Sequence, residues 1–178
     1  MNPSTYDLLA AIHAAGAPEA IVLPNSPNVI MAAERAAGLS QIPTSVVPTR
    51  SQQEGLLSLI AFDPSLSAAE NCRAVAEAAA ALATGGIAPA AKDDVQGRFR
   101  TGDAVGYVGD ELVAWGDASA TLGEVLRQVG EHAEVVTLIS GDGAPFEAEA
   151  IEALLPNGAE MELHSGGQAA WWYLVAAE

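Results

Sequence analysis

The chain has 178 residues, of which 50% are hydrophobic, and its 23 acidic and 7 basic side chains give a formal net charge of −16. This length suits one domain that buries roughly 70% of the surface its unfolded form would expose. So acidic a surface repels phosphate backbones and anionic lipid headgroups, which excludes nucleic acid and anionic membranes as partners.

The first half of the chain alternates helical patterns with short apolar runs. Three serines stand three residues before an acidic residue, which is typical of helix capping boxes: Ser4 before Asp7, Ser51 before Glu54 and Ser67 before Glu70. We predict helices over 4–15, 27–37, 51–62 and 67–83 and buried strands over 20–23 and 45–47, with Thr84-Gly85-Gly86 ending the last helix.

The second half is richer in strands. We predict strands over 87–93, 104–108, 111–115, 135–139, 160–164 and 171–175 and helices over 121–132 and 146–155. Gly109-Asp110 between two of these strands predicts a hairpin. The order predicts one α/β domain over residues 1–178, with a mostly parallel sheet flanked by helices and an antiparallel hairpin insert.

Cysteine and histidine usage indicates a reducing compartment and no metal site. The single cysteine, Cys72, cannot form an intramolecular disulfide, and His13, His132 and His164 lack the spacing of metal ligands. No run reaches the roughly 18 apolar residues that a membrane span needs, and the N-terminus lacks a signal-peptide pattern. We therefore expect a cytoplasmic protein with no membrane span.

Polar or glycine-rich segments follow four of the predicted strands. If those strands are parallel, their carboxyl ends share one sheet edge, where ligands of open α/β sheets bind. The segments are Asn25-Ser26-Pro27-Asn28, Thr49-Arg50-Ser51-Gln52-Gln53, Ser140-Gly141-Asp142-Gly143 and His164-Ser165-Gly166-Gly167-Gln168. They predict a recognition surface at this edge, and the alternative is that these loops are polar only because they are turns.

The first of these turns has two interpretations. A helix that begins after Asn25-Ser26-Pro27-Asn28 offers backbone N–H groups to an anion or polar ligand. Alternatively, Asn25 or Ser26 is the N-cap, Pro27 is the first helical residue, and nothing binds there.

Two further side chains are candidates for binding. Arg50, one of only seven basic residues, stands at a strand end and suits a carboxylate or phosphate, or else a surface salt bridge. His164 suits hydrogen bonding to a ligand or chemistry at neutral pH, or else a structural role. Gly166 and Gly167 are expected to serve the backbone turn.

Catalytic motifs are missing from the chain. It has no Walker loop, no Gly-x-Ser-x-Gly elbow, no His-Glu-x-x-His and no spaced cysteine pair. We therefore predict no catalytic residue and no bound metal, and catalysis by this chain alone is unsupported.

Several segments together resemble one known family. They are Met1-Asn-Pro-Ser-Thr5, Val22-Leu-Pro-Asn-Ser-Pro-Asn-Val-Ile30, Val47-Pro-Thr-Arg-Ser-Gln-Gln-Glu-Gly55, Ala61-Phe-Asp-Pro64 and His164-Ser-Gly-Gly-Gln168. In this order, and over essentially all 178 residues, the chain resembles the C-terminal region of the dihydroxyacetone-kinase-like subunit of bacterial fatty acid kinase.

The resemblance implies that this chain works together with other domains of a longer protein and with a separate carrier protein. The full-length protein is expected to have an N-terminal kinase domain, which holds ATP and magnesium, and a middle domain, both outside this chain. A DegV-like carrier holds the fatty acid whose carboxylate receives the ATP γ-phosphate, and the acyl-phosphate feeds phospholipid synthesis. The C-terminal domain has a DegV-like fold and is expected to dock the carrier, so the implied partners are that carrier and the rest of the kinase subunit.

The resemblance also implies a set of ligand- or partner-binding positions, none of them an ATP ligand. These are Asn25, Ser26, Asn28, Thr49, Arg50, Ser51, His164, Gly166, Gly167 and Gln168. Gln52-Gln53 lies where the family varies. The alternative function is a small-ligand or acyl-binding α/β domain related to DegV-like lipid-binding proteins, and an independent hydrolase or kinase rests on fold analogy alone. An oligomeric state is left open.

Overall fold

The computed structural model describes residues 2–156 and 158–178. The chain divides into two compact units, which we call unit 1 (Met1–Ala81) and unit 2 (Leu82–Glu178). Each unit contains a sheet of its own, with two strands in unit 1 and six in unit 2. The prediction of one sheet for the whole chain is therefore wrong, whereas the prediction of a single domain over residues 1–178 stays a prediction.

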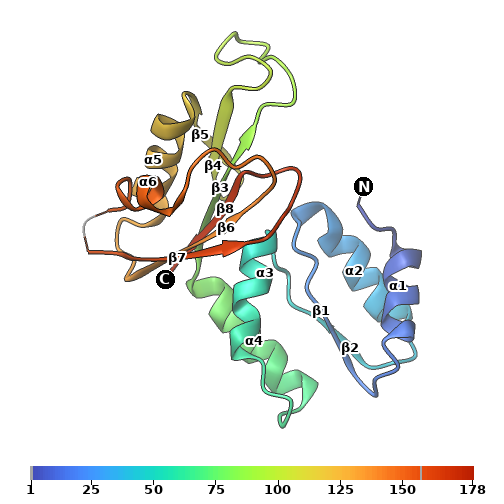
Figure 1. Ribbon diagram of the computed structural model, residues 1–178. Helices are drawn as coiled ribbons and strands as arrows, with labels where there is room; N and C mark the ends of the chain where they lie inside the picture. The colour runs from blue at the N-terminus through green and yellow to red at the C-terminus, as the bar shows by residue number, and fades with distance from the viewer. Residues whose placement is uncertain (1, 157) are drawn as a thin grey trace. The chain divides into compact units, whose positions relative to one another are not determined.

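Unit 1 surrounds a short parallel ribbon with helices. Its elements are α1 (Thr5–Ala14), β1 (Ala20–Val22), α2 (Pro27–Leu39), β2 (Thr44–Val46), α3 (Gln52–Ser58), the 3₁₀ turn η1 (Leu59–Ala61) and α4 (Ala68–Ala81). β1 and β2 pair in parallel, with Ile21 opposite Ser45. The α1–α2 pair and the α3–α4 pair lie on opposite sides of this ribbon (Figure 1).

Helical periodicity determines which residues of unit 1 are buried. α2 buries Val29, Ala33 and Ala36, and α4 buries Asn71, Val75 and Ala79. These positions recur every three or four residues, so they fall on one face of each helix.

All three predicted capping boxes form. In each, the serine hydroxyl accepts a hydrogen bond from the backbone N–H of the acidic residue, whose carboxylate accepts from the serine N–H: Ser4 with Asp7, Ser51 with Glu54 and Ser67 with Glu70. Each box satisfies two N–H groups at the start of a helix and so determines where that helix begins.

Unit 2 is a mixed sheet with helices against it. Its elements are β3 (Ala83–Pro89), β4 (Ala104–Val108), β5 (Glu111–Gly116), α5 (Ala118–Val129), β6 (Val135–Ser140), α6 (Ala148–Glu152), β7 (Glu160–Ser165) and β8 (Tyr173–Ala177), and the strand order is β5-β4-β3-β8-β6-β7. The predicted α/β class and the β4–β5 hairpin are confirmed, with Val108 opposite Glu111. The α6 helix is shorter than predicted, and β8 begins two residues later.

The expectation of a mostly parallel sheet is wrong for unit 2. Within the described part of this sheet, β6–β7 is the parallel pair and the other four pairings are antiparallel. The cause is β8, which returns from the end of the chain and inserts between β3 and β6, antiparallel to both. Short apolar runs do not encode which strand pairs with which, so sequence patterns gave no warning of this insertion.

Close helix packing explains why β3 begins earlier than predicted. Gly85 lies inside β3, where a Cβ atom would come within 2.8 Å of Val129 Cγ2, and at Gly106 of β4 it would come within 2.7 Å of Val125 Cγ2. Glycine at these positions lets α5 approach the sheet. The glycines predicted to stop a helix thus belong to a strand.

The start of α5 also differs from the prediction. Asp117 is the N-cap, and its Oδ1 accepts a hydrogen bond from the Ala120 N–H at 2.9 Å. Thr121, predicted to begin the helix, lies within its first turns and is 1% exposed. Asp117 thus caps the helix four residues before Thr121, where we predicted the helix to begin.

The core of unit 2 lies between α5 and one face of the sheet. Leu122, Val125 and Leu126 of α5 pack with Leu138 of β6, and Tyr173 of β8 belongs to the same fully buried cluster. The Tyr173 hydroxyl accepts from the Phe146 N–H at 2.7 Å and donates to the Phe146 carbonyl at 2.8 Å. Burial raises the pKa of Tyr173 above its usual value of 10.0.

Candidate functional site

The predicted site residues divide between the two units. Because β1–β2 and β6–β7 belong to different sheets, no single sheet edge collects the ends of all four strands. Unit 1 contains Asn25, Ser26, Asn28, Thr49, Arg50 and Ser51, and unit 2 contains His164, Gly166, Gly167 and Gln168. The predicted strand-end segments thus belong to two groups, one in each unit, and each group has a geometry of its own.

In unit 1 the two strand ends are hydrogen-bonded to each other. Asn25 follows β1 and Thr49 follows β2, and the Thr49 side chain is fully buried. The Thr49 hydroxyl donates to Asn25 Oδ1 at 2.7 Å, and the Asn25 N–H donates to Thr49 Oγ1 at 3.0 Å. The Thr49 hydroxyl and the Asn25 amide oxygen are therefore hydrogen-bonded within the fold.

Asn25 also has an uncommon backbone conformation. Its φ of 56° lies in the left-handed region, which asparagine tolerates better than most residues. Its side-chain amide lies directly against the Cα of Gly55 in α3, where a Cβ atom would overlap Asn25 Oδ1 and Cγ. Asn25, Thr49 and Gly55 form what we call the Asn25 cluster, which joins the ends of β1 and β2 to α3.

The starts of α2 and α3 differ in how they are capped. The Glu54 carboxylate accepts from the Arg50 N–H at 2.7 Å and from the Ser51 N–H at 3.2 Å, so it occupies the N-terminus of α3. At α2, Pro27 is the first helical residue as predicted, but Ser26 at the N-cap makes no side-chain capping bond in the described structure. The prediction that Asn25 or Ser26 is the N-cap is thus confirmed for Ser26 in position, although its hydroxyl does not bond the N–H groups of the helix.

In unit 2 the turn after β7 folds back onto β6. The Ser140 carbonyl accepts from the Gly166 N–H at 2.8 Å and from the Gly167 N–H at 3.1 Å. Gln168 Nε2 donates to the Ile139 carbonyl at 2.8 Å. The side chain of Gln168 thus serves the backbone of the neighbouring strand.

Three glycines make this turn sterically possible. A Cβ atom on Gly166 would overlap Gln168 Oε1, and one on Gly141 would overlap the Gln168 and Trp171 carbonyl oxygens. Gly167 has φ of 66°, which favours glycine. The expectation that Gly166 and Gly167 serve the turn is confirmed. The equal need for Gly141 was missed, although its Ser-Gly-Asp-Gly context signalled a tight loop.

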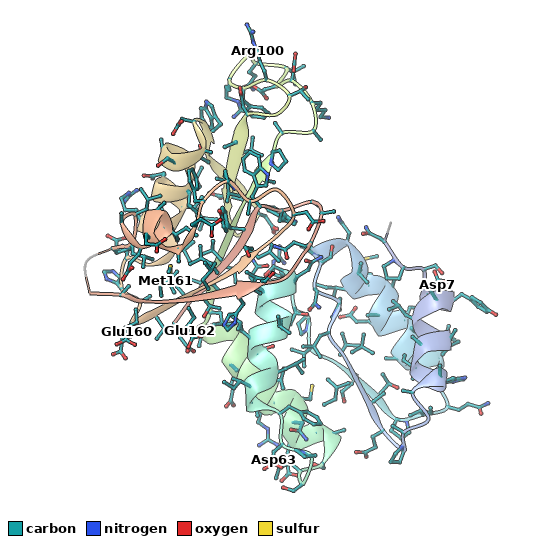
Figure 2. All side chains as sticks on the ribbon, in the orientation of Figure 1. Asp7, Asp63, Arg100, Glu160, Met161 and Glu162 are labelled. Atoms are coloured by element: carbon teal, nitrogen blue, oxygen red, sulfur yellow. The ribbon has the colours of Figure 1, made fainter. Side chains whose placement is uncertain are left out.

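His164 lies on an exposed strand at the edge of the sheet. On β7 the side chains of Glu160, Glu162 and His164 are exposed, and Met161 and Leu163 are half-buried. Figure 2 labels the first three residues of this strand, Glu160, Met161 and Glu162. His164 Nε2 is 3.7 Å from Glu162 Oε2, with 61% and 60% of these side chains exposed. Charged side chains along an edge strand discourage pairing with other chains, which is a structural role.

An apolar groove in unit 1 is the feature that strand-end reasoning missed. Its volume is about 530 Å³, and we define the apolar groove by its lining residues: Ala17, Pro18, Glu19, Ile21, Leu23, Leu59, Phe62, Pro64, Leu66, Ala68, Asn71 and Val75. Leu59, Phe62 and Leu66 are 43%, 46% and 43% exposed. Their clustering in the connection between α3 and α4 was the available sequence signal.

The two polar side chains of the groove are already hydrogen-bonded. Asn71 Nδ2 donates to the carbonyls of Asp63 and Leu66 at 2.8 and 3.3 Å, and its Oδ1 accepts from the Asp63 N–H at 2.7 Å. Glu19 Oε2 accepts from the Ala68 N–H at 3.1 Å. What the groove offers a ligand is therefore chiefly apolar contact.

Two carboxylates, those of Asp94 and Glu124, have strongly lowered pKa values. Hydrogen bonding from Arg98 lowers the pKa of Asp94 from 3.8 to about 2, and hydrogen bonding from Arg127 and Gln128 lowers the pKa of Glu124 from 4.5 to about 2. A general acid near neutral pH needs the opposite shift. Within residues 2–156 and 158–178, no three metal-binding side chains gather, and no helix is long and apolar enough to cross a membrane.

Solved structures define the class of fold. The fatty acid kinase B3 protein of Streptococcus pneumoniae, loaded with linoleic acid, matches 99% of this chain and 76% of its own with a TM-score of 0.63 at 15% identity. A DegV family protein of Corynebacterium glutamicum matches with the same TM-score at 19% identity over 99% of this chain and 83% of its own. The dihydroxyacetone kinase of C. freundii matches 98% of this chain and 41% of its own with a TM-score of 0.59 at 13% identity. The predicted DegV-like fold is confirmed.

Sequence relatives then define the family. The family of C-terminal domains of FakA-like fatty acid kinase subunits matches residues 1–178, and the chain belongs to it. Protein YloV of Bacillus subtilis strain 168 is 31% identical over 186 residues, and an uncharacterized protein of Staphylococcus epidermidis is 32% identical over 188 residues. Each match covers the whole of this chain but 34% of the relative, so the chain spans about a third of their length.

Proposed function

We propose that this chain is the non-catalytic docking domain of a fatty acid kinase subunit. It binds a DegV-like carrier protein and presents the carrier's fatty acid to a kinase site elsewhere in the longer polypeptide. ATP and magnesium bind outside this chain, the assembly works in the cytoplasm, and its acyl-phosphate product enters phospholipid synthesis.

The internal hydrogen bonding of three strand-end side chains is the observation that carries this proposal. The Asn25 amide oxygen, the Thr49 hydroxyl and the Gln168 amide nitrogen are hydrogen-bonded within the chain and therefore serve the fold. The Ser26 side chain, by contrast, makes no capping bond in the described structure. The carboxylates with the largest pKa shifts are held ionised, which suits a surface and not a general acid. Family membership supplies the context of a fatty acid kinase.

Of the predicted site residues, the exposed ones suit a partner best. Asn28, Arg50 and His164 are exposed, whereas Thr49 is fully buried and Gln168 is bonded to the backbone. Because a docking surface needs accessible side chains, we assign partner contact to the first three and structural support to the others.

A second candidate function is binding of an acyl chain by this domain itself. The apolar groove favours it, because about 530 Å³ of apolar space can accept part of a hydrocarbon chain. Against it, the charged residue that lines the groove is Glu19, an acid, which repels a fatty acid carboxylate.

Calorimetric titration with an acid-loaded DegV-like carrier tests the docking function. We expect a dissociation constant in the micromolar range, as is common for transient assemblies. Arg50→Ala should weaken binding, whereas Arg35→Ala, at an exposed arginine of α2, serves as the matched control. Absence of binding up to about 1 mM would refute docking.

An activity assay tests the non-catalytic part of the proposal. The chain is mixed with ATP, magnesium and free fatty acid, and acyl-phosphate is trapped with hydroxylamine. We expect no product above the rate without protein. Turnover by the chain alone would overturn the assignment as a docking domain and restore the hypothesis of an independent kinase.

A further inference from the structure

The loop between β3 and β4 concentrates basic residues in an acidic protein. Of the seven basic residues of the chain, Lys92, Arg98 and Arg100 lie in this loop, and Lys92 is the only lysine of the sequence. The loop extends beyond the paired parts of both strands (Figure 1), and we call residues 90–103 the basic loop. Because the whole chain has a net charge of −16, an anion meets less repulsion where these cations gather.

Internal hydrogen bonds give the basic loop a defined shape. The Asp94 carboxylate accepts from the Gln96 N–H at 3.1 Å and from the Arg98 N–H at 3.2 Å. Asp93 Oδ1 accepts from the N–H and from the hydroxyl of Thr101, both at 2.8 Å, and so joins the two arms of the loop. A loop that is ordered in advance loses less conformational entropy when it binds a ligand.

The same bonds bring Lys92 and Arg100 to facing positions. Lys92 directly precedes Asp93 and Arg100 directly precedes Thr101, so the two basic residues stand on opposite arms beside the bonded pair. Both are exposed, and Figure 2 shows Arg100 at the outer end of the loop. Within residues 2–156 and 158–178, neither side chain makes a hydrogen bond or an ion pair.

Arg98, by contrast, serves the loop itself. Its Nε and Nη2 donate to the two carboxylate oxygens of Asp94 at 2.9 and 3.0 Å. Its guanidinium carbon also lies 5.1 Å from the ring centroid of Trp115, within the range of a cation–π contact. Lys92 and Arg100 are therefore the two cations of the basic loop that a ligand can reach.

The three acids of the basic loop limit the size of that ligand. Asp103 accepts from the Arg100 N–H at 2.7 Å, and Asp93 and Asp94 accept from the donors described above. These carboxylates stay negatively charged and repel an extended anionic surface. A small anion can pair with the end of an exposed basic side chain without approaching them. The basic loop therefore suits a small anionic ligand.

An exposed amine opposite an exposed guanidinium suits an acyl-phosphate. A guanidinium binds phosphate through two parallel hydrogen bonds, as Arg100 is free to do. The neutral amine of a lysine is a nucleophile for carbonyl carbon. An acyl-phosphate carries a phosphate and an activated carbonyl in one molecule, so binding of its phosphate by Arg100 raises the local concentration of its carbonyl at Lys92.

We propose that Lys92 is an acylation site, which reacts with an acyl-phosphate whose phosphate is bound by Arg100. The neutral amine attacks the acyl carbon and a carbon–nitrogen bond forms. The bond from that carbon to the phosphate oxygen breaks, phosphate leaves with the electron pair, and the nitrogen loses a proton to water. The product is an amide, so Lys92 loses its positive charge. This inference rests on the proposed function for the source of the acyl-phosphate.

Octanoyl phosphate, a soluble acyl-phosphate, tests the site on the 178-residue chain by mass spectrometry. The amide should form on Lys92 at least about five times faster than on the side chain of N-acetyl-lysine amide in the same solution, because the bound phosphate holds the carbonyl near the amine. This advantage should shrink between about 50 and 500 mM salt, because salt screens exposed charges. Lys92→Arg, which keeps the charge and removes the amine, should leave the basic loop unlabelled, and octanoate should not react.

Two arginine variants test the role of Arg100. Arg100→Ala should slow acylation of Lys92 at least about threefold, because the bidentate phosphate contact is lost. Arg35→Ala, at an exposed arginine of α2, is the matched control and should leave the rate unchanged. Inorganic phosphate should compete with octanoyl phosphate in the wild type and have little effect on Arg100→Ala. Circular dichroism checks that each variant is folded.

The outcomes separate this inference from the docking function. If Lys92 reacts no faster than N-acetyl-lysine amide, or if Arg100→Ala reacts as fast as the wild type, the acylation site is wrong. If the carrier fails to bind in calorimetry but Lys92 is acylated at a rate that depends on Arg100, docking is wrong and the acylation site stands. If the carrier binds and Lys92 shows no such reactivity, docking stands and the acylation site is refuted.

Discussion

Two buried threonines allow the importance of the Asn25 cluster to be measured by one substitution. Thr49 is fully buried with two hydrogen bonds to Asn25, and Thr121 is 1% exposed with a hydroxyl that has no partner within the described structure. Valine replaces the hydroxyl with a methyl group of similar size. Thr49→Val and Thr121→Val therefore make the same chemical change in opposite hydrogen-bonding situations.

The expected changes in the free energy of unfolding have opposite signs. Each of the two hydrogen bonds of Thr49 contributes about 1 kcal/mol net, so Thr49→Val should lose about 2 kcal/mol. Burial of a hydroxyl without a partner costs about 1–3 kcal/mol, so Thr121→Val should gain about 1 kcal/mol. At about 2–4 °C per kcal/mol for a chain of this size, Tm should fall by about 4–8 °C for Thr49→Val and rise by about 2–4 °C for Thr121→Val.

Urea titration followed by two signals provides the assay. The three tryptophans, Trp115, Trp171 and Trp172, all lie in unit 2, so their fluorescence follows that unit, while far-ultraviolet circular dichroism follows helices of both units. Circular dichroism is therefore the signal for Thr49→Val. If both valine variants shift stability equally, or if Thr49→Val leaves it unchanged, the hydrogen bonds of the Asn25 cluster do not stabilise the fold as we reason.

Three further predictions concern packing, ionisation and cooperativity. Gly55→Ala should lose about 2 kcal/mol because its methyl group overlaps Asn25, whereas Gly38→Ala, in open space on α2, should gain about 0.5–1 kcal/mol, and comparable urea midpoints would contradict this. Arg98→Gln should raise the pKa of Asp94 from about 2 toward 3.8 in an NMR titration, and an unchanged pKa would disprove the role of Arg98. Because the folded state lowers this pKa, the ionised carboxylate stabilises the fold above its unfolded pKa, and this contribution is lost as the pH falls through about 2. If the whole chain is one folding domain, the fluorescence and circular dichroism transitions should coincide, and two midpoints would instead show that units 1 and 2 unfold separately.

Local chemistry made much of the fold predictable. Ser4 and Asp7 stand three residues apart and bond to each other, and Gly109-Asp110 forms the two-residue turn of the β4–β5 hairpin. Such signals need no knowledge of distant residues, because their hydrogen bonds close within one turn of chain. The family was also recognisable from its motifs, which match over residues 1–178.

The candidate site was less predictable. Asn25 and Thr49 were both among the predicted binding positions, but their hydrogen bonds are to each other. The apolar groove was not predicted, because Leu59, Phe62 and Leu66 form it only together with β1 and α4. The cluster of apolar residues between α3 and α4 was visible in the sequence, but a hollow depends on how elements pack, so the sequence did not show whether these side chains would be covered.

By itself the sequence determined the α/β class, the order of its helices and strands, and the family to which the chain belongs. Only the tertiary structure decided that β8 inserts antiparallel between β3 and β6, that β1 and β2 form a separate sheet, and that Asn25 and Thr49 bond to each other. The physical reason is how far apart along the chain the interacting residues lie. Helix caps and tight turns form between neighbours in the chain, whereas strand pairing and the hollows between elements arise from contacts between residues far apart, which no local pattern records.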